Sequence, residues 1–88
     1  MNLEFSERFY KDLNSLKDKK LKIKLADIID ECKDAKNLQG IRNLKKLEGF
    51  ESYYRIRIGD YRLGIEFSGQ VIKFLRIANR KDIYKIFP

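Results

Sequence analysis

The 88-residue chain contains no histidine and only one cysteine, and these two shortages limit the chemistry open to it. Histidine is the usual general acid and base near neutral pH and the commonest metal ligand in proteins. One cysteine, Cys32, can neither complete a zinc site nor form a disulfide within the chain. We therefore expect no metal site and no cofactor, and a reducing cytoplasm as the natural setting. Any catalysis must use arginine, lysine, tyrosine or carboxylate side chains.

Proline, glycine and long apolar runs are also scarce. One proline and five glycines in a chain that is 43% hydrophobic argue against disorder and low complexity. No apolar run approaches the roughly 20 residues needed to cross a bilayer, and the N-terminal residues lack a signal-peptide core. We predict one globular domain over residues 1–88, located in the cytoplasm and not bound to a membrane.

Positive charge, by contrast, is abundant. Twenty lysines and arginines face thirteen acidic residues, which leaves a formal net charge of +7. Such an excess on a small chain favours association with phosphate groups or with an acidic protein.

The N-terminal half shows the spacing of a strand followed by two helices. Residues 2–5 can form a short strand, and Ser6 suits an N-cap for a first helix of about three turns that ends near Leu16. Residues 17–19 indicate a break. A second apolar stripe predicts a longer helix to about residue 35, so the two form a helical hairpin. Residues 37–51 are less regular and are interpreted as a connecting segment anchored by its leucines.

Residues 53–67 alternate strictly between apolar and polar side chains, which is typical of two half-buried strands. A two-residue turn at Gly59-Asp60 sets the register. It collects the arginines on one face and places four pairs opposite one another: Ile58 with Tyr61, Arg57 with Arg62, Ile56 with Leu63, and Arg55 with Gly64.

This register sets two arginines directly across the ladder. Like charges in that position destabilise a sheet by some tenths of a kcal/mol, so the pair suggests an anionic ligand. A plain solvated face with long basic side chains is the alternative. Gly64 leaves room opposite Arg55 for a backbone segment or a ligand.

A last strand is predicted from Val71 to Ile77. With Ser68-Gly69 as its turn, Ile65 would face Ile72 and Leu63 would face Phe74. The expected fold is α+β with the order βααβββ, in which the helical hairpin packs on one face of a mostly antiparallel sheet. If the tail of residues 79–88 curls beside the sheet, Arg80 and Tyr84 join the arginines of the hairpin.

Four segments resemble the RelE/ParE superfamily of bacterial and archaeal toxins from type II toxin-antitoxin modules, and its RelE side more closely. They span almost the whole chain: residues 5–13 (FSERFYKDL), 47–49 (LEG), 54–63 (YRIRIGDYRL) and 80–84 (RKDIY). The hairpin string together with the terminal RKDIY is quite specific, whereas the N-terminal string alone is weak.

The resemblance to RelE implies a microbial-ribonuclease-like fold, cleavage of mRNA in the ribosomal A site, and inhibition by a cognate antitoxin. By position, the implied catalytic residues are Arg55, Arg57, Arg62, Arg80 and Tyr84. Asn79 departs from the many members that have histidine before the last arginine, although other RelE enzymes also lack that histidine. We expect the antitoxin to contribute an acidic, partly disordered segment.

In the implied reaction a ribose 2′-OH attacks the adjacent phosphate. Arg57 and Arg62 are expected to stabilise the charge that develops on the phosphoryl oxygens. Arginine hardly ever loses its proton, so Tyr84 is the better candidate for proton transfer, with stacking on a base or core packing as its alternatives. Further RNA contacts are expected from flanking residues, which could also be merely solvated: Lys45, Lys46, Asn79 and Lys81.

Two other functions fit the same sequence. One is a ParE-like toxin that inhibits DNA gyrase and cleaves no RNA, because one scaffold can serve both targets. The other is a degenerate RNA-binding module without activity, which Asn79 motivates. The dense basic residues of the sheet and Tyr84 favour the ribosome-dependent endoribonuclease.

Overall fold

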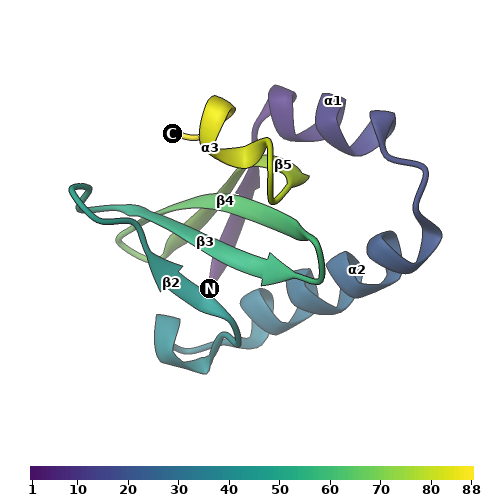
Figure 1. Cartoon of the computed structure of the whole chain (residues 1–88). Coiled ribbons are helices and arrows are strands. Elements are labelled where there is room, and N and C mark those ends of the chain that lie inside the picture. Colours follow the sequence, from purple (N-terminus) through teal and green to yellow (C-terminus); the bar gives the residue numbers. More distant parts are fainter.

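Five strands form one sheet in the order β1-β5-β4-β3-β2, and the computed structural model describes all residues from 1 to 88 (Figure 1). β1 runs parallel to β5, and the other neighbours are antiparallel. The elements are β1 (Asn2–Phe5), α1 (Glu7–Ser15), α2 (Lys19–Asp34), a 3-10 turn (Leu38–Gly40), β2 (Leu44–Lys46), β3 (Tyr53–Ile58), β4 (Tyr61–Ser68), β5 (Val71–Asn79) and α3 (Ile83–Ile86). The predicted α+β class is confirmed, and β2, the 3-10 turn and α3 are additions to the predicted order.

α1 begins where the sequence predicts, whereas α2 begins one residue earlier, at Lys19. The Ser6 hydroxyl accepts a hydrogen bond from the Phe9 amide at 3.0 Å, and the Asp18 carboxylate accepts one from the Leu21 amide at 3.1 Å. These caps satisfy amide groups that the first turn of a helix leaves free. The break predicted at residues 17–19 is therefore shorter than expected, because Asp18 caps α2 and Lys19 is its first helical residue.

The two helices cover one face of the sheet and complete its core. α1 lies against β5, whereas α2 contacts β1 and β3. Strand residues such as Ile56, Leu63 and Phe74 are fully buried there, together with Phe9 and Cys32 from the helices. In Figure 1, α3 (yellow) lies on the other side of the sheet from α2. We call the sheet face on the side of α3 the outer face. No helix of the chain is long and apolar enough to span a membrane.

The single cysteine is a core residue. Burial raises the pKa of the Cys32 thiol to about 11. A thiol with so high a pKa stays protonated near neutral pH and is a poor nucleophile.

The first hairpin has the predicted register at every pair, including Arg57 opposite Arg62. The predicted position of the turn between β4 and β5 was wrong. The turn is Gly69-Gln70 instead of Ser68-Gly69. The first residue of each turn is a glycine with a positive φ, +58° at Gly59 and +62° at Gly69, as a type II′ turn requires. Glycine therefore leads both turns.

The register of β4 and β5 consequently differs from the predicted one. Ile65 faces Phe74 instead of Ile72, and Leu63 faces Ile77 instead of Phe74. The ladder passes from Ile65–Phe74 to Gly64–Arg76, which leaves Leu75 as an extra residue. Because this bulge reverses the alternation, Ile77 enters the core and Arg76 turns to the outer face.

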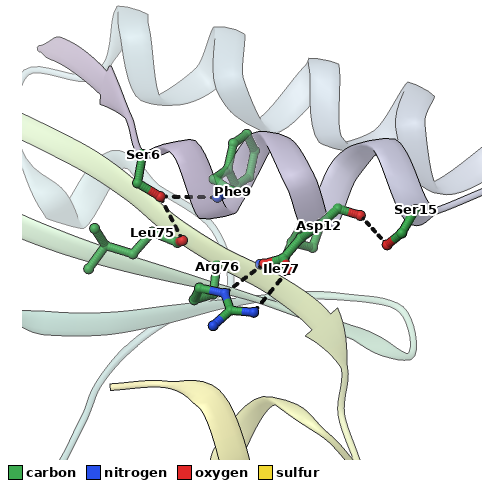
Figure 2. A network of polar contacts seen from close by, with 7 residues as sticks. All are labelled: Ser6, Phe9, Asp12, Ser15, Leu75, Arg76 and Ile77. Carbon is green, nitrogen blue, oxygen red and sulfur yellow. Dashed lines mark hydrogen bonds and ion pairs between the residues drawn. The ribbon is translucent and has the colours of Figure 1, made fainter.

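α1 completes the edge of β5 beyond the reach of β1. β1 pairs only as far as Phe74. The Ser6 hydroxyl donates to the Leu75 carbonyl at 2.9 Å, and the Asp12 carboxylate accepts from the Ile77 amide at 3.0 Å. The same carboxylate accepts hydrogen bonds from Nε and Nη2 of Arg76 at 2.8 and 3.0 Å (Figure 2). These hydrogen bonds raise the pKa of Arg76. Asp12 therefore fixes α1 to the half of β5 that leads to the tail.

The variant Asp12→Asn tests this tie. The pair is largely buried, with 16% of the Asp12 side chain and 19% of the Arg76 side chain exposed. Removing the charged acceptor should lower the free energy of unfolding by about 1–3 kcal/mol, as measured by urea denaturation.

The exposed pair of Asp82 and Lys85 supplies the control. Its atoms are 3.9 Å apart, and 63% and 78% of the two side chains are exposed. Asp82→Asn should cost under about 1 kcal/mol. Equal losses in the two variants would show that Asp12 does not hold α1 in place.

Candidate functional site

Basic side chains from three strands meet on the outer face. Arg57 of β3 lies opposite Arg62 of β4, and Arg55 lies opposite Lys45 of β2. These four residues, together with Asn43 and Leu44, line a hollow of about 270 Å³ that we call the cationic hollow. The structure therefore brings together three predicted catalytic residues and one predicted RNA-binding lysine.

The charge in this hollow is not neutralised within the chain. No acidic residue lines it, and none of the three ion pairs of the structure involves its arginines or Lys45. Like charges held on neighbouring strands repel one another. An anionic group that entered the hollow would relieve this repulsion.

Two of the arginines are held in place by neighbouring groups. Nη1 of Arg62 donates to the carbonyls of Gly59 and Tyr61, each at 2.9 Å, so the guanidinium folds back against the β3–β4 turn. Nη1 of Arg55 donates to the Tyr84 hydroxyl, and its guanidinium carbon lies 5.6 Å from the centre of the Tyr84 ring. Tyr84 as a whole is 59% exposed, which rules out core packing as its role.

Tyr84 reaches Arg55 because the tail is anchored on Gly64. Ile83 and Phe87, at the two ends of α3, are buried. A Cβ atom added to Gly64 would lie 2.6–2.8 Å from three carbons of the Phe87 ring. The room predicted opposite Arg55 is therefore filled by a side chain of the protein itself.

The end of β5 places Arg80 near the same turn as Arg62. The Arg80 amide donates to the Asp60 carbonyl at 2.7 Å, while its side chain is exposed. The Asn79 side-chain oxygen accepts from the Lys81 amide at 3.0 Å. Asn79 thus shapes the turn into the tail, and Lys81 does not line the cationic hollow.

Lys46 points away from this site. It pairs with Tyr54, which packs against the core, so it lies on the opposite face of the sheet from Lys45. Asn43 and Leu44 line the hollow but were missed in the sequence, because the three residues of β2 are too few to show alternation. Asn43 has a φ of +62°, a conformation that asparagine tolerates better than most residues.

The variant Gly64→Ala tests the anchor. The added methyl group has no free space, so the Phe87 ring must move and Tyr84 should separate from Arg55. We expect a loss of about 1–3 kcal/mol in unfolding free energy from overpacking. A change in the NMR signals of the Tyr84 ring should accompany it.

A double variant distinguishes a collision with the Phe87 ring from a general effect of alanine in a strand on the unfolding free energy. In a Phe87→Ala background, Gly64→Ala should be close to neutral, because the ring it collides with is absent. The same loss in both backgrounds would show that Gly64 does not act through Phe87.

Comparisons with known proteins agree with the resemblance seen in the sequence. A family model described as the ParE toxin of the type II toxin-antitoxin system, parDE, matches residues 3–84. Toxin RelE3 of Methanocaldococcus jannaschii is 42% identical over 90 residues, covering 100% of both chains.

Solved structures extend the agreement to the fold. A chain of the RelB-RelE antitoxin-toxin complex from Methanococcus jannaschii matches with a TM-score of 0.83 and 39% identity, over 97% of this chain and 99% of that one. The RelE-RelB complex from Pyrococcus horikoshii OT3 matches with a TM-score of 0.70 and 26% identity, over 90% and 93%.

Proposed function

Because this chain belongs to the RelE/ParE superfamily and is a toxin of a type II toxin-antitoxin system, we propose that it is a metal-independent endoribonuclease that cleaves mRNA on the ribosome. The observation that carries the proposal is the cationic hollow, whose unpaired arginines lie beside an exposed tyrosine. Its product ends would be a 2′,3′-cyclic phosphate and a 5′-OH, and its site of action the cytoplasm.

The arginines would supply electrostatic stabilisation. When the 2′-oxygen bonds to phosphorus and the 5′-oxygen leaves, negative charge grows on the phosphoryl oxygens. Arg57 and Arg62 line the hollow from opposite strands and could bind these oxygens from two sides. Arg62 is already held by the turn carbonyls, so little reorganisation is needed. Arg80, which follows β5 and does not line the hollow, would add an exposed positive charge near it.

Tyr84 would handle the protons. The 2′-OH must lose a proton as it attacks, and the 5′-oxygen must gain one as it leaves. Arg55 donates a hydrogen bond to the Tyr84 oxygen, which holds this oxygen beside an arginine of the cationic hollow, where it would exchange protons with the reacting oxygens. Arginine cannot take this role, because it stays protonated.

The partner that restrains this activity would be a cognate antitoxin. Relatives of known structure were solved as RelB-RelE and RelE-RelB complexes. An acidic, partly disordered segment would suit a toxin of net charge +7, by covering the cationic hollow or lying along the helical hairpin.

The variant Arg62→Ala tests the proposed chemistry. It removes one guanidinium from the hollow without touching the core, so cleavage should fall about 10²–10³-fold with the fold intact. The measurement is mapping of mRNA 5′ ends in a translating extract.

Lys11→Ala is the matched control, because it removes one positive charge from an exposed position on α1. It should cleave within about twofold of the unchanged protein, since an isolated surface charge contributes little. Full activity of Arg62→Ala would remove this arginine from the catalytic site.

A gyrase inhibitor is the second candidate, and the family model named for ParE favours it. The same extract distinguishes the two functions. Cuts confined to ribosome-occupied messages support the endoribonuclease, whereas intact mRNA together with induced DNA breaks would replace it with the gyrase inhibitor.

A further inference from the structure

Two neighbouring aromatic side chains, the exposed Phe50 and the half-buried Tyr53, lie near the cationic hollow, and the proposed chemistry does not use them. The rings of Phe50 and Tyr53 are 5.5 Å apart between centroids and inclined at 59°. The Tyr53 ring meets the edge of the buried Phe87 ring at 5.6 Å and 72°. Phe50 is 44% exposed although it is a large apolar side chain. We call Phe50 and Tyr53 the aromatic strip.

The backbone holds the aromatic strip in place. The Leu47 amide donates to the Tyr53 carbonyl at 2.9 Å, which closes the loop that carries Phe50. The Phe67 amide donates to the Ser52 carbonyl at 2.8 Å, which ties the same loop to β4. The rings are therefore presented on a loop with both ends fixed to the sheet.

The position of the strip matches that of a nucleotide next to the cleaved phosphate. Tyr53 and Arg55 are two residues apart on β3 and share the outer face, so they are separated by about 7 Å along the strand. Arg55 lines the cationic hollow. A phosphate bound in the hollow would bring a neighbouring base to the level of Tyr53.

Acidic residues around the strip indicate which part of a nucleotide it binds. Glu66 lies opposite Tyr53 on one side and Lys73 of β5 on the other, and none of the ion pairs of the structure involves it. Glu48 and Glu51, in the loop with Phe50, are exposed. These carboxylates repel phosphates and acidic peptides, but a carboxylate accepts hydrogen bonds from the amino groups of bases.

We propose that Phe50, Tyr53 and Glu66 form a binding site for an unpaired base next to the phosphate in the cationic hollow. This inference rests on the proposed function, because it takes RNA as the ligand. Stacking on the rings supplies affinity, and Glu66 favours bases with an exocyclic amino group, such as cytosine over uracil.

The test is an NMR titration of the whole chain with 2′-O-methyl RNA pentamers, which lack the attacking hydroxyl and stay intact. A second pentamer is abasic and carries the same phosphates. Ring signals of Phe50 and Tyr53 should shift with the base-bearing RNA alone. Backbone signals of Arg55 and Arg57 should shift with both.

Two variants sharpen the assignment. Phe50→Leu keeps an apolar side chain and removes the ring, so it should weaken binding of the base-bearing RNA about tenfold and leave the abasic RNA unchanged. Glu66→Gln should abolish the preference for cytosine-containing over uracil-containing pentamers, because the amide both donates and accepts.

Other outcomes would overturn the base site. If Arg55 and Arg57 respond to both ligands while Phe50 and Tyr53 stay silent, the site is absent and the proposed function stands. If none of the four responds, the base site is absent, and loss of the proposed function as well would require intact mRNA in the translating extract. A Phe50→Leu variant that binds RNA normally but loses affinity for the antitoxin would assign the strip to a protein interface.

Discussion

The contact between Gly64 and Phe87 is the constraint on which the candidate site depends. The strand position that faces Arg55 lacks a side chain, and the Phe87 ring occupies the space a Cβ would need. This packing holds α3 on the outer face and brings Tyr84 to Arg55. A site made from residues far apart in sequence is thus assembled by one close approach of a ring to a backbone.

The stability of the molecule comes from the other side of the sheet. Fully buried residues such as Ile56, Leu63 and Phe74 form the core with the two helices, and Asp12 ties α1 to β5. The stability from this packing compensates for the repulsion among the arginines of the cationic hollow, which no acidic residue lines. Binding sites commonly carry such local destabilisation, because the ligand relieves it.

Local patterns predicted some elements well and long-range contacts poorly. The first hairpin followed from strict alternation and a glycine-led turn, and every pair was right. The second turn was misplaced by one residue because the bulge at Leu75 lets an arginine leave the core face, which alternation alone cannot reveal. The tie between Asp12 and Arg76 joins residues 64 positions apart and has no local signal. The arginines that line the cationic hollow were predicted from the sequence. That Lys46 lies on the opposite face of the sheet became clear only from the pairing of β2 with β3.

The most direct test of the central claim is the chemistry of the cut itself. Purified toxin should cleave ribosome-bound mRNA to leave a 2′,3′-cyclic phosphate and a 5′-OH, because the attacking group is the neighbouring 2′-oxygen. An mRNA with a single 2′-deoxy nucleotide on the 5′ side of the cut should resist cleavage at that bond. Cleavage of the deoxy message at the same bond, or ends with a 3′-OH and a 5′-phosphate, would contradict a mechanism built on arginines and Tyr84.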